Sequence, residues 1–313
     1  MIMNKLVVST AALGAVVAMA LPAQAAVQPK WQRVGTDITG GVSGMALVAG
    51  APIGHGRADV LIVRDNKKDG ENRISTVRLR PGKAPAVTPL TWKGPLPKDV
   101  EALDAVPGRK NHYIALASEG TAYHVTVAGG TATVQGAPVS LPDRKDGDNY
   151  ESFALFRGSA GKLFAVWATR GKNAEKAVVR TAPATVGKAS LRIGTTADQE
   201  KFAVPFPNQD EVRHVSDLKV LPNGTVLVSS ASDPNDDNGP FSSAVYNAGK
   251  LKIKGGHPVL DLKKTGSLRA LRRFTKKDDH KVEGIVALAN GQAIWGTDDE
   301  NLGGFVAFDQ VPR

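Results

Sequence analysis

Five segments of this 313-residue sequence repeat one pattern, in which a small or acidic residue precedes alternating apolar positions. The polar position of the pattern stands at 43, 101, 151, 216 and 283. Each segment continues through a turn with Gly or Pro into an apolar strand, such as 60–63 or 163–167, and then a third strand. Most units show a weaker fourth strand. Repeated units of about 50–65 residues with four strands each are typical of a β-propeller.

The two ends of the sequence complement each other. The last unit ends after its third strand, at Phe308, whereas the strand Trp31-Gln32-Arg33-Val34 precedes the first unit. We expect the N-terminal strand to complete the last blade, because this pairing removes two free sheet edges. The sequence therefore predicts an all-β, five-bladed propeller with four-stranded blades. A β-sandwich with coincidental spacing is the alternative, but the recurrence in register favours the ring.

The first 25 residues have the pattern of an export signal. Lys5 precedes an apolar run over 6–19, and Ala23-Gln24-Ala25 forms a cleavage site. The run is shorter than the roughly 20 residues of a membrane span. We expect a periplasmic or secreted protein, with residues 26–313 as a single propeller domain. The net charge of +10 favours anionic partners, but the basic residues are not interleaved with aromatics, which argues against nucleic acid.

The repeated polar position has a chemical consequence. The first strand of each propeller blade lines the axis, so five equivalent side chains should converge there. They are Ser43, Glu101, Glu151, Ser216 and Glu283. Three converging carboxylates repel one another unless a cation is present, and calcium takes 6–8 oxygen ligands. With no cysteine in the chain and no histidine at these positions, zinc and copper are disfavoured. The alternatives are a solvated channel in which Lys or Arg pairs with each Glu, or a purely structural ion.

At these residues the sequence resembles the soluble calcium-activated nucleotidases (apyrases), five-bladed propellers whose axial calcium is held by the same Ser, Glu, Glu, Ser, Glu series. The local context is also similar: Lys281-Val282-Glu283-Gly284-Ile285 resembles the last metal segment of that family, K-Y-E-G-I. Two departures stand out. The paired arginines of the family become Thr169-Arg170, and its Asp-rich segment becomes the sequence over 64–70.

The resemblance implies an exported, calcium-dependent hydrolase of nucleoside di- and triphosphates, in which metal-activated water cleaves the phosphoanhydride. Its anionic substrate would be a nucleotide or a phosphate ester. Asp65 is the candidate that orients the water. The alternative is that Asp65 is an ordinary turn residue. Arg170 and, second, Arg64 are the candidate phosphate contacts. The other hypotheses are a non-enzymatic binding propeller with a structural calcium ion, and a phytase-like phosphoesterase, which six blades would favour.

We do not expect the other polar clusters of the sequence to form functional sites. The acidic loops 233–239 and Asp298-Asp299-Glu300 lack the spacing of a known calcium loop, so we expect solvated turns. The six histidines show no metal-ligand spacing, and His214, two residues before Ser216, is expected at a loop or strand end.

Overall fold

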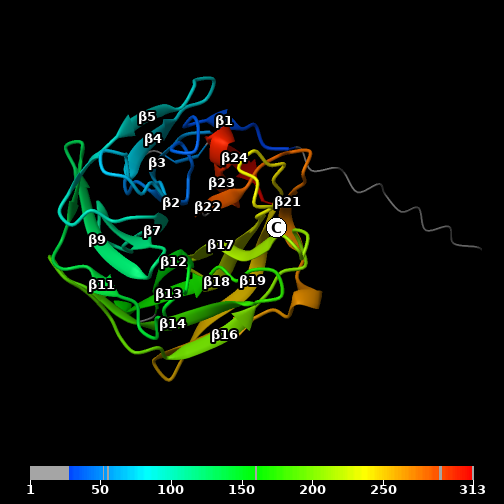
Figure 1. Cartoon of the computed structure of the whole chain (residues 1–313). Coiled ribbons are helices and arrows are strands. Elements are labelled where there is room, and N and C mark those ends of the chain that lie inside the picture. Colours follow the sequence, from blue (N-terminus) through cyan, green and yellow to red (C-terminus); the bar gives the residue numbers. More distant parts are fainter. Residues whose placement is uncertain (1–27, 52, 55, 159–160, 289–290, 312–313) are drawn as a thin grey trace, which may run out of the picture.

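A computed structural model describes residues 28–51, 53–54, 56–158, 161–288 and 291–311. The expected signal segment over 1–25 lies outside these residues. The described chain forms five sheets around a central axis, one for each repeated segment, and their strands are antiparallel except for one short parallel pair (Figure 1). The predicted all-β, five-bladed propeller is confirmed. No described helix is long and apolar enough to cross a membrane.

Two blades have four strands and no additions. Blade 1 contains β2 (Gly44–Leu47), β3 (Ala58–Val63), β4 (Ile74–Leu79) and β5 (Ala86–Pro89). Blade 5 contains β22 (Val282–Ala287), β23 (Gln292–Asp298), β24 (Gly304–Gln310) and the N-terminal β1 (Gln32–Arg33). The β1–β24 pair places Gln32 opposite Val306 and Arg33 opposite Phe305, which confirms the predicted closure of the ring.

In each of the other three blades, two short strands take the position of the fourth strand, and both pair with the third strand. Blade 2 contains β7 (Val100–Ala105), β8 (His112–Ala117), β9 (Thr121–Ala128), β10 (Thr131–Val134) and β11 (Val139–Ser140), with β6 (Thr91–Lys93) parallel to β10. Blade 3 contains β12 (Tyr150–Arg157), β13 (Leu163–Thr169), β14 (Ala177–Val186), β15 (Leu191–Ile193) and β16 (Asp198–Phe202). Blade 4 contains β17 (Val212–Val220), β18 (Thr225–Ser232), β19 (Ser243–Lys254), β20 (His257–Leu262) and β21 (Ala270–Phe274).

The innermost strands form the wall of the axis. Around the ring, β2 contacts β7, β7 contacts β12, β12 contacts β17, β17 contacts β22, and β22 returns to β2. The approach is close at Gly44, where a Cβ atom would lie 2.9 Å from the Cα of Ala102. Real Cβ atoms do not tolerate such a contact, so glycine at this position allows β2 to pack directly against β7.

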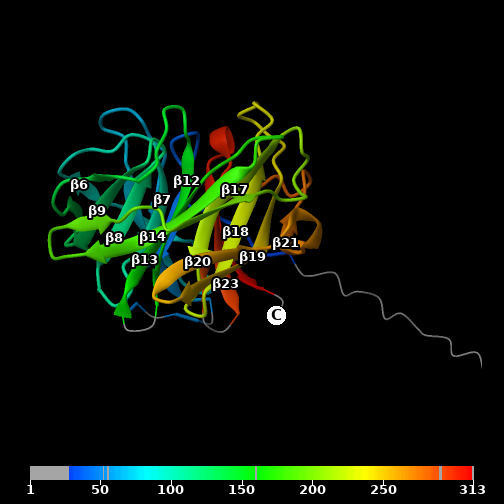
Figure 2. The same ribbon diagram turned by 90° about the horizontal axis from the view of Figure 1, so that it is seen from below.

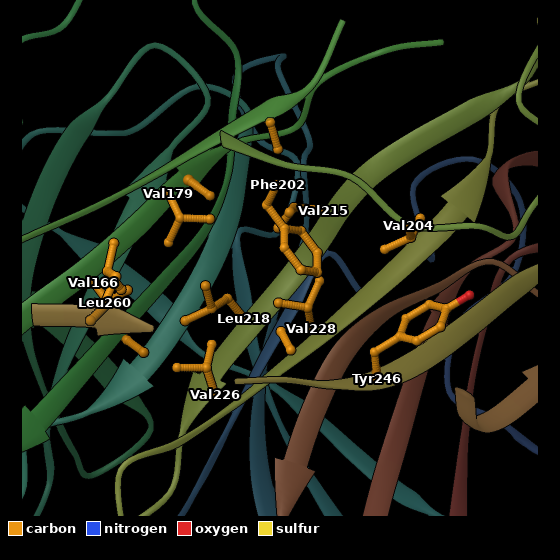
Figure 3. Close-up of a cluster of buried hydrophobic side chains, with 14 of the residues drawn as sticks. Val166, Val179, Phe202, Val204, Val215, Leu218, Val226, Val228, Tyr246 and Leu260 are labelled. Atoms are coloured by element: carbon orange, nitrogen blue, oxygen red, sulfur yellow. The ribbon is translucent and has the colours of Figure 1, made fainter. Parts of the chain in front are cut away.

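Hydrophobic side chains between blades hold the ring together. The largest interface cluster joins blades 3 and 4, where Val166 and Val179 face Leu218 and Val228, with Phe202 among them (Figure 3). All five are 1% exposed or less. Figure 2 shows the same blades from the side, with their strands adjacent through the depth of the ring. Because neighbouring blades cover both faces of an inner strand, a strand such as β13 (LFAVWAT) is apolar and buried on both faces.

Candidate functional site

A β-bulge marks the axial residue in four of the five inner strands. The strand register shifts between Val100 and Ala102, between Tyr150 and Ser152, and between Val282 and Gly284, so that Glu101, Glu151 and Glu283 are each the extra residue. In β17 the shift spans Arg213 to Asp217 and includes Ser216. A bulge re-aims a side chain relative to the regular pleat, and bulges are frequent beside functional sites.

The three axial glutamates meet. One carboxylate oxygen from each of Glu101, Glu151 and Glu283 lies within 4.8 Å of the others, although they come from blades 2, 3 and 5. Their residues are 9%, 1% and 2% exposed. Two oxygens bound to one calcium ion at about 2.3–2.6 Å are at most about 5 Å apart. The three carboxylates are therefore close enough to share a single ion.

Positively charged side chains surround the cluster unevenly. Arg170 Nη1 lies 3.5 Å from Glu151 Oε1, and Arg213 Nη1 lies 3.3 Å from Glu283 Oε1. Lys281 Nζ is 3.5 Å from Glu283 Oε1 but is shared with Asp298 and Glu300. Glu101 has no ion pair within the described part of the chain. Two of the three glutamates thus form direct ion pairs, as in a simple channel, whereas Glu101 interacts with Arg213 and Lys67 only at longer range among the described residues.

The two serines predicted at the axis are buried polar groups without a partner in the part of the chain that the structure describes. Ser43, just before β2, is 1% exposed and Ser216 is 0% exposed. Neither hydroxyl oxygen has a hydrogen-bond partner among the described residues. Buried polar atoms in native proteins nearly always have a partner, from the protein, from water or from an ion. Carboxylates with neutral oxygens are the ligand mixture that calcium prefers, so the predicted residue set fits this ion.

Burial makes negative charge costly at the axis. It raises the pKa of Glu101 well above its ordinary value, and the neighbouring Glu151 raises this pKa further. Burial also raises the pKa of Glu283, against the opposing effect of Lys281. The pKa of Asp298 rises to about 7 for the same reason, with Lys281 again opposing. A cation that binds here must displace protons from the carboxyl groups.

Asp65 belongs to a second cluster that shares Glu101. It follows β3 directly, and one of its carboxylate oxygens lies within 4.8 Å of oxygens of Asp99 and Glu101. Burial raises the pKa of Asp65, with Lys281 opposing. Asp99 pairs with Lys67 Nζ at 3.1 Å and accepts a hydrogen bond from Ser118 Oγ. The structure therefore brings this sequence candidate beside the axial glutamates.

The two candidate arginines differ in their surroundings. Arg170 follows β13, lines a cavity and contacts Glu151. Arg64 is 6% exposed, and its Nη1 and Nη2 atoms donate to the backbone carbonyls of Gly41 and Val34. Its guanidinium therefore ties blade 1 to the N-terminal segment and is not available to a substrate.

Sequence reasoning missed several residues of the site. The expectation of a solvated turn at Asp298-Asp299-Glu300 is wrong, because Asp298 is 3% exposed and Asp299 is 0% exposed. Lys281 and Arg213 were not singled out, although their spacing of two and three residues from Glu283 and Ser216 was a usable signal. His214 lies within β17 and is buried, and its Nε2 atom lies 2.9 Å from the carbonyl oxygen of Asn173.

Comparisons with known proteins bear on the fold. No family model and no curated protein matches this chain. Among solved structures, a thermostable family-43 glycoside hydrolase is 10% identical, with 90% of this chain and 93% of that chain covered and a TM-score of 0.50. A family-43 β-xylosidase/α-arabinofuranosidase from a compost metagenome, in complex with xylotriose and calcium-free, is 11% identical, with coverages of 91% and 96% and a TM-score of 0.41. The calcium structure of a Trichoderma reesei carbohydrate-active enzyme of family AA12 is 11% identical, with coverages of 92% and 97% and a TM-score of 0.46.

These structures correct the nucleotidase prediction. The thermostable structure with the TM-score of 0.50 is a family-43 glycoside hydrolase and not a nucleotidase. Membership of the nucleotidase family, hydrolysis of nucleoside phosphates, and a nucleotide or phosphate ester as partner are wrong. The physical reason is that all five matching stretches are axial strand starts. A five-bladed ring brings these positions to its axis whatever substrate it acts on, so the match is to the architecture and does not identify a substrate.

Proposed function

We propose that this chain is a calcium-dependent glycan hydrolase. The cation would be held by Glu101, Glu151 and Glu283, with Ser43 and Ser216 as neutral ligands. The observation that carries this proposal is the convergence of three buried carboxylates from three blades within 4.8 Å. When bound, calcium would supply the positive charge that balances these carboxylates and would fix three blades relative to one another.

The second carboxylate cluster supports hydrolysis of a glycosidic bond. Glycosidases use one protonated carboxyl group as acid and one carboxylate as base or nucleophile. Asp65, whose pKa burial raises, is suited to hold the proton and donate it to the leaving-group oxygen. Asp99, paired with Lys67, is suited to the second role. Their oxygens lie within 4.8 Å, which corresponds to the shorter carboxylate separation of the two glycosidase classes, that of retaining enzymes.

The position of the cluster is consistent with a substrate site. Asp65 follows β3 and Asp99 precedes β7, so both lie at the end of the ring where the inner strands begin. Arg170, which follows β13, lies at the same end. The similar fold of a family-43 glycoside hydrolase supports a glycan as the substrate class.

A glycan panel tests this function. We expect reducing ends to be released from at least one polysaccharide in the presence of calcium, and the release to stop with chelator. In Asp65→Asn the rate should fall by about 10²–10⁴-fold, because the acid catalyst is lost while the shape is kept. Asp69→Asn, in the exposed loop after β3, is the matched control and should keep the full rate. No release from any glycan by folded, calcium-loaded protein would contradict the proposal.

A further inference from the structure

Blade 3 carries a basic cavity beside the axial site. The cavity has a volume of about 740 Å³ and lies between β14, β16 and the loops that precede β12 and follow β13. Six basic residues line it: Lys145, Arg170, Lys172, Lys176, Arg180 and Lys201. Only two acidic residues, Asp148 and Glu175, accompany them in the lining. No aromatic residue belongs to the lining described, so the cavity is built to attract charge and offers no ring on which a neutral sugar could stack.

Arg180 is a buried cation in the cavity wall that the described residues leave without an anionic partner. It lies on β14, is 5% exposed, and its Nε and Nη1 atoms have no hydrogen-bond partner among the described residues. It also has no ion pair there. A buried guanidinium without a counter-charge is costly, so its presence calls for an anion that the described chain does not supply.

The other buried arginines of the described chain provide a comparison. Arg64 donates to the carbonyls of Gly41 and Val34, and Arg73 donates to those of Pro97, Glu71 and Lys68. Arg272 pairs with Asp309. The fold therefore satisfies its structural arginines with oxygen atoms of its own. Arg180 departs from this rule: it lines a cavity as Arg272 does, but unlike Arg272 it has no carboxylate partner among the described residues, which indicates a ligand-binding role.

The basic cavity has neighbours on two sides. A second cavity of about 560 Å³ shares Lys145 and Arg180 with the first, and its own lining adds Thr196, Gln199 and the acidic Asp143 and Asp198, so the excess of positive charge is confined to the first cavity. At the other side, Arg170 lines the first cavity and lies 3.5 Å from Glu151 of the axial cluster. Arg170 therefore connects the wall of the first cavity to the axial carboxylates.

We propose that these cavities bind an acidic polysaccharide, with Arg180 pairing with a carboxylate or sulfate group on the sugar chain. The bidentate guanidinium fork matches the planar geometry of a carboxylate and also binds sulfate. The inference rests on the proposed function, which makes a glycan the substrate. It narrows that substrate class from glycans in general to anionic ones. Charge then provides the binding energy that aromatic stacking would provide in a site for neutral sugars.

Calorimetric binding separates this inference from catalysis. The probes are a galacturonate hexamer, which carries carboxylates, a heparin-type hexamer, which carries sulfates, and a neutral xylohexaose. We expect one of the two anionic probes to bind and the neutral probe to bind at least tenfold more weakly. The stronger anionic probe identifies the charged group. Binding without bond cleavage would contradict the proposed hydrolase and leave this inference intact.

Arg180→Met tests the residue itself. We expect it to weaken binding of the anionic probe by about tenfold to a hundredfold, the usual effect of losing a charge-assisted hydrogen bond. Because the variant also removes an unpaired buried charge, its melting temperature should be unchanged or higher. Arg192→Met, at an exposed position on β15 of the same blade, is the control and should bind normally. Unchanged binding with a lowered melting temperature would overturn the proposal, as would equal affinity for anionic and neutral probes.

Discussion

Replacing Glu101 with Gln should change the melting temperature in opposite directions with and without calcium. In chelator the variant should melt higher than the wild type, because a buried carboxyl that repels Glu151 and Asp65 becomes neutral. With calcium at about 100 times the dissociation constant, the wild type should gain about 2.7 kcal/mol, and the variant should lose most of that gain. Glu101 is the informative position because it belongs to both carboxylate clusters and has no ion pair in the described chain.

Thermal unfolding in calcium and in chelator measures both effects. Glu119→Gln, an exposed glutamate in the turn after β8, is the control and should respond to calcium as the wild type does. A shift of the same sign in both conditions would mean that Glu101 has a structural role only. In that case the alternative would be preferred, in which the three glutamates line a solvated channel and bind no ion.

Replacing Lys219 with Met should destabilise the ring more than any other single change that we consider. Lys219 is 7% exposed, and its Nζ atom lies 3.1 Å from Asp217 Oδ1 and donates to the carbonyl of Leu103 at 3.0 Å. It therefore links β17 of blade 4 to β7 of blade 2, at the opposite end of the inner strands from Asp65. Breaking a buried ion pair from one side costs about 3–5 kcal/mol. That corresponds to a fall of roughly 6–20 °C in melting temperature.

The cost of Lys219→Met should increase with pH. Burial raises the pKa of Asp217 to about 7, against the opposing effect of Lys219, whereas its ordinary value is 3.8. Without Lys219 this pKa rises further, so the folded state retains a proton that the unfolded state loses above about pH 4. Stability is then kept at acidic pH and lost as the pH rises through the folded-state pKa. Unfolding in urea at pH 5 and pH 8 should show a larger deficit at pH 8.

The double variant Asp217→Asn, Lys219→Met is the control for this effect. It removes both charges of the pair but keeps the buried Asp104, whose pKa burial raises and Lys219 lowers, so it should recover part of the stability and reduce the pH dependence without abolishing it. The amide that replaces the carboxylate would still face the backbone N–H of Ile285, which donates to Asp217 Oδ2 at 2.8 Å in the wild type. A deficit in Lys219→Met that is independent of pH would contradict the assignment of the pair as charged.

The five-bladed propeller could be predicted from the sequence because each strand and turn is specified by residues close together in the chain. Alternating apolar residues and turn signals specify each strand, and symmetry then places the five repeated positions on one axis. That the N-terminal strand completes the last blade followed from counting strands, whereas its register opposite Phe305 did not. The nucleotidase resemblance failed for a related reason: its matching stretches were the ones that the symmetry of the ring determines.

The details of the site could not be predicted, because they depend on contacts between distant segments. The burial of Asp298 and Asp299 results from packing of blade 5 against Lys281 and His280, 17 to 19 residues away in the chain. The lack of a partner for Arg180 is visible only once its neighbours on β13 and β16 are placed. Sequence patterns indicate which residues approach the axis, but they do not indicate which charges remain uncompensated there.

The most direct test is a crystal structure of the protein grown with calcium, with anomalous scattering used to locate the ion. We expect one peak at the axis, with oxygen atoms of Glu101, Glu151 and Glu283 at about 2.3–2.6 Å. The contacts of Arg170 with Glu151 and of Arg213 with Glu283 should lengthen as the carboxylates turn to the ion. An axis without a peak, with both ion pairs kept at their present 3.5 and 3.3 Å, would contradict the calcium site and the function built on it.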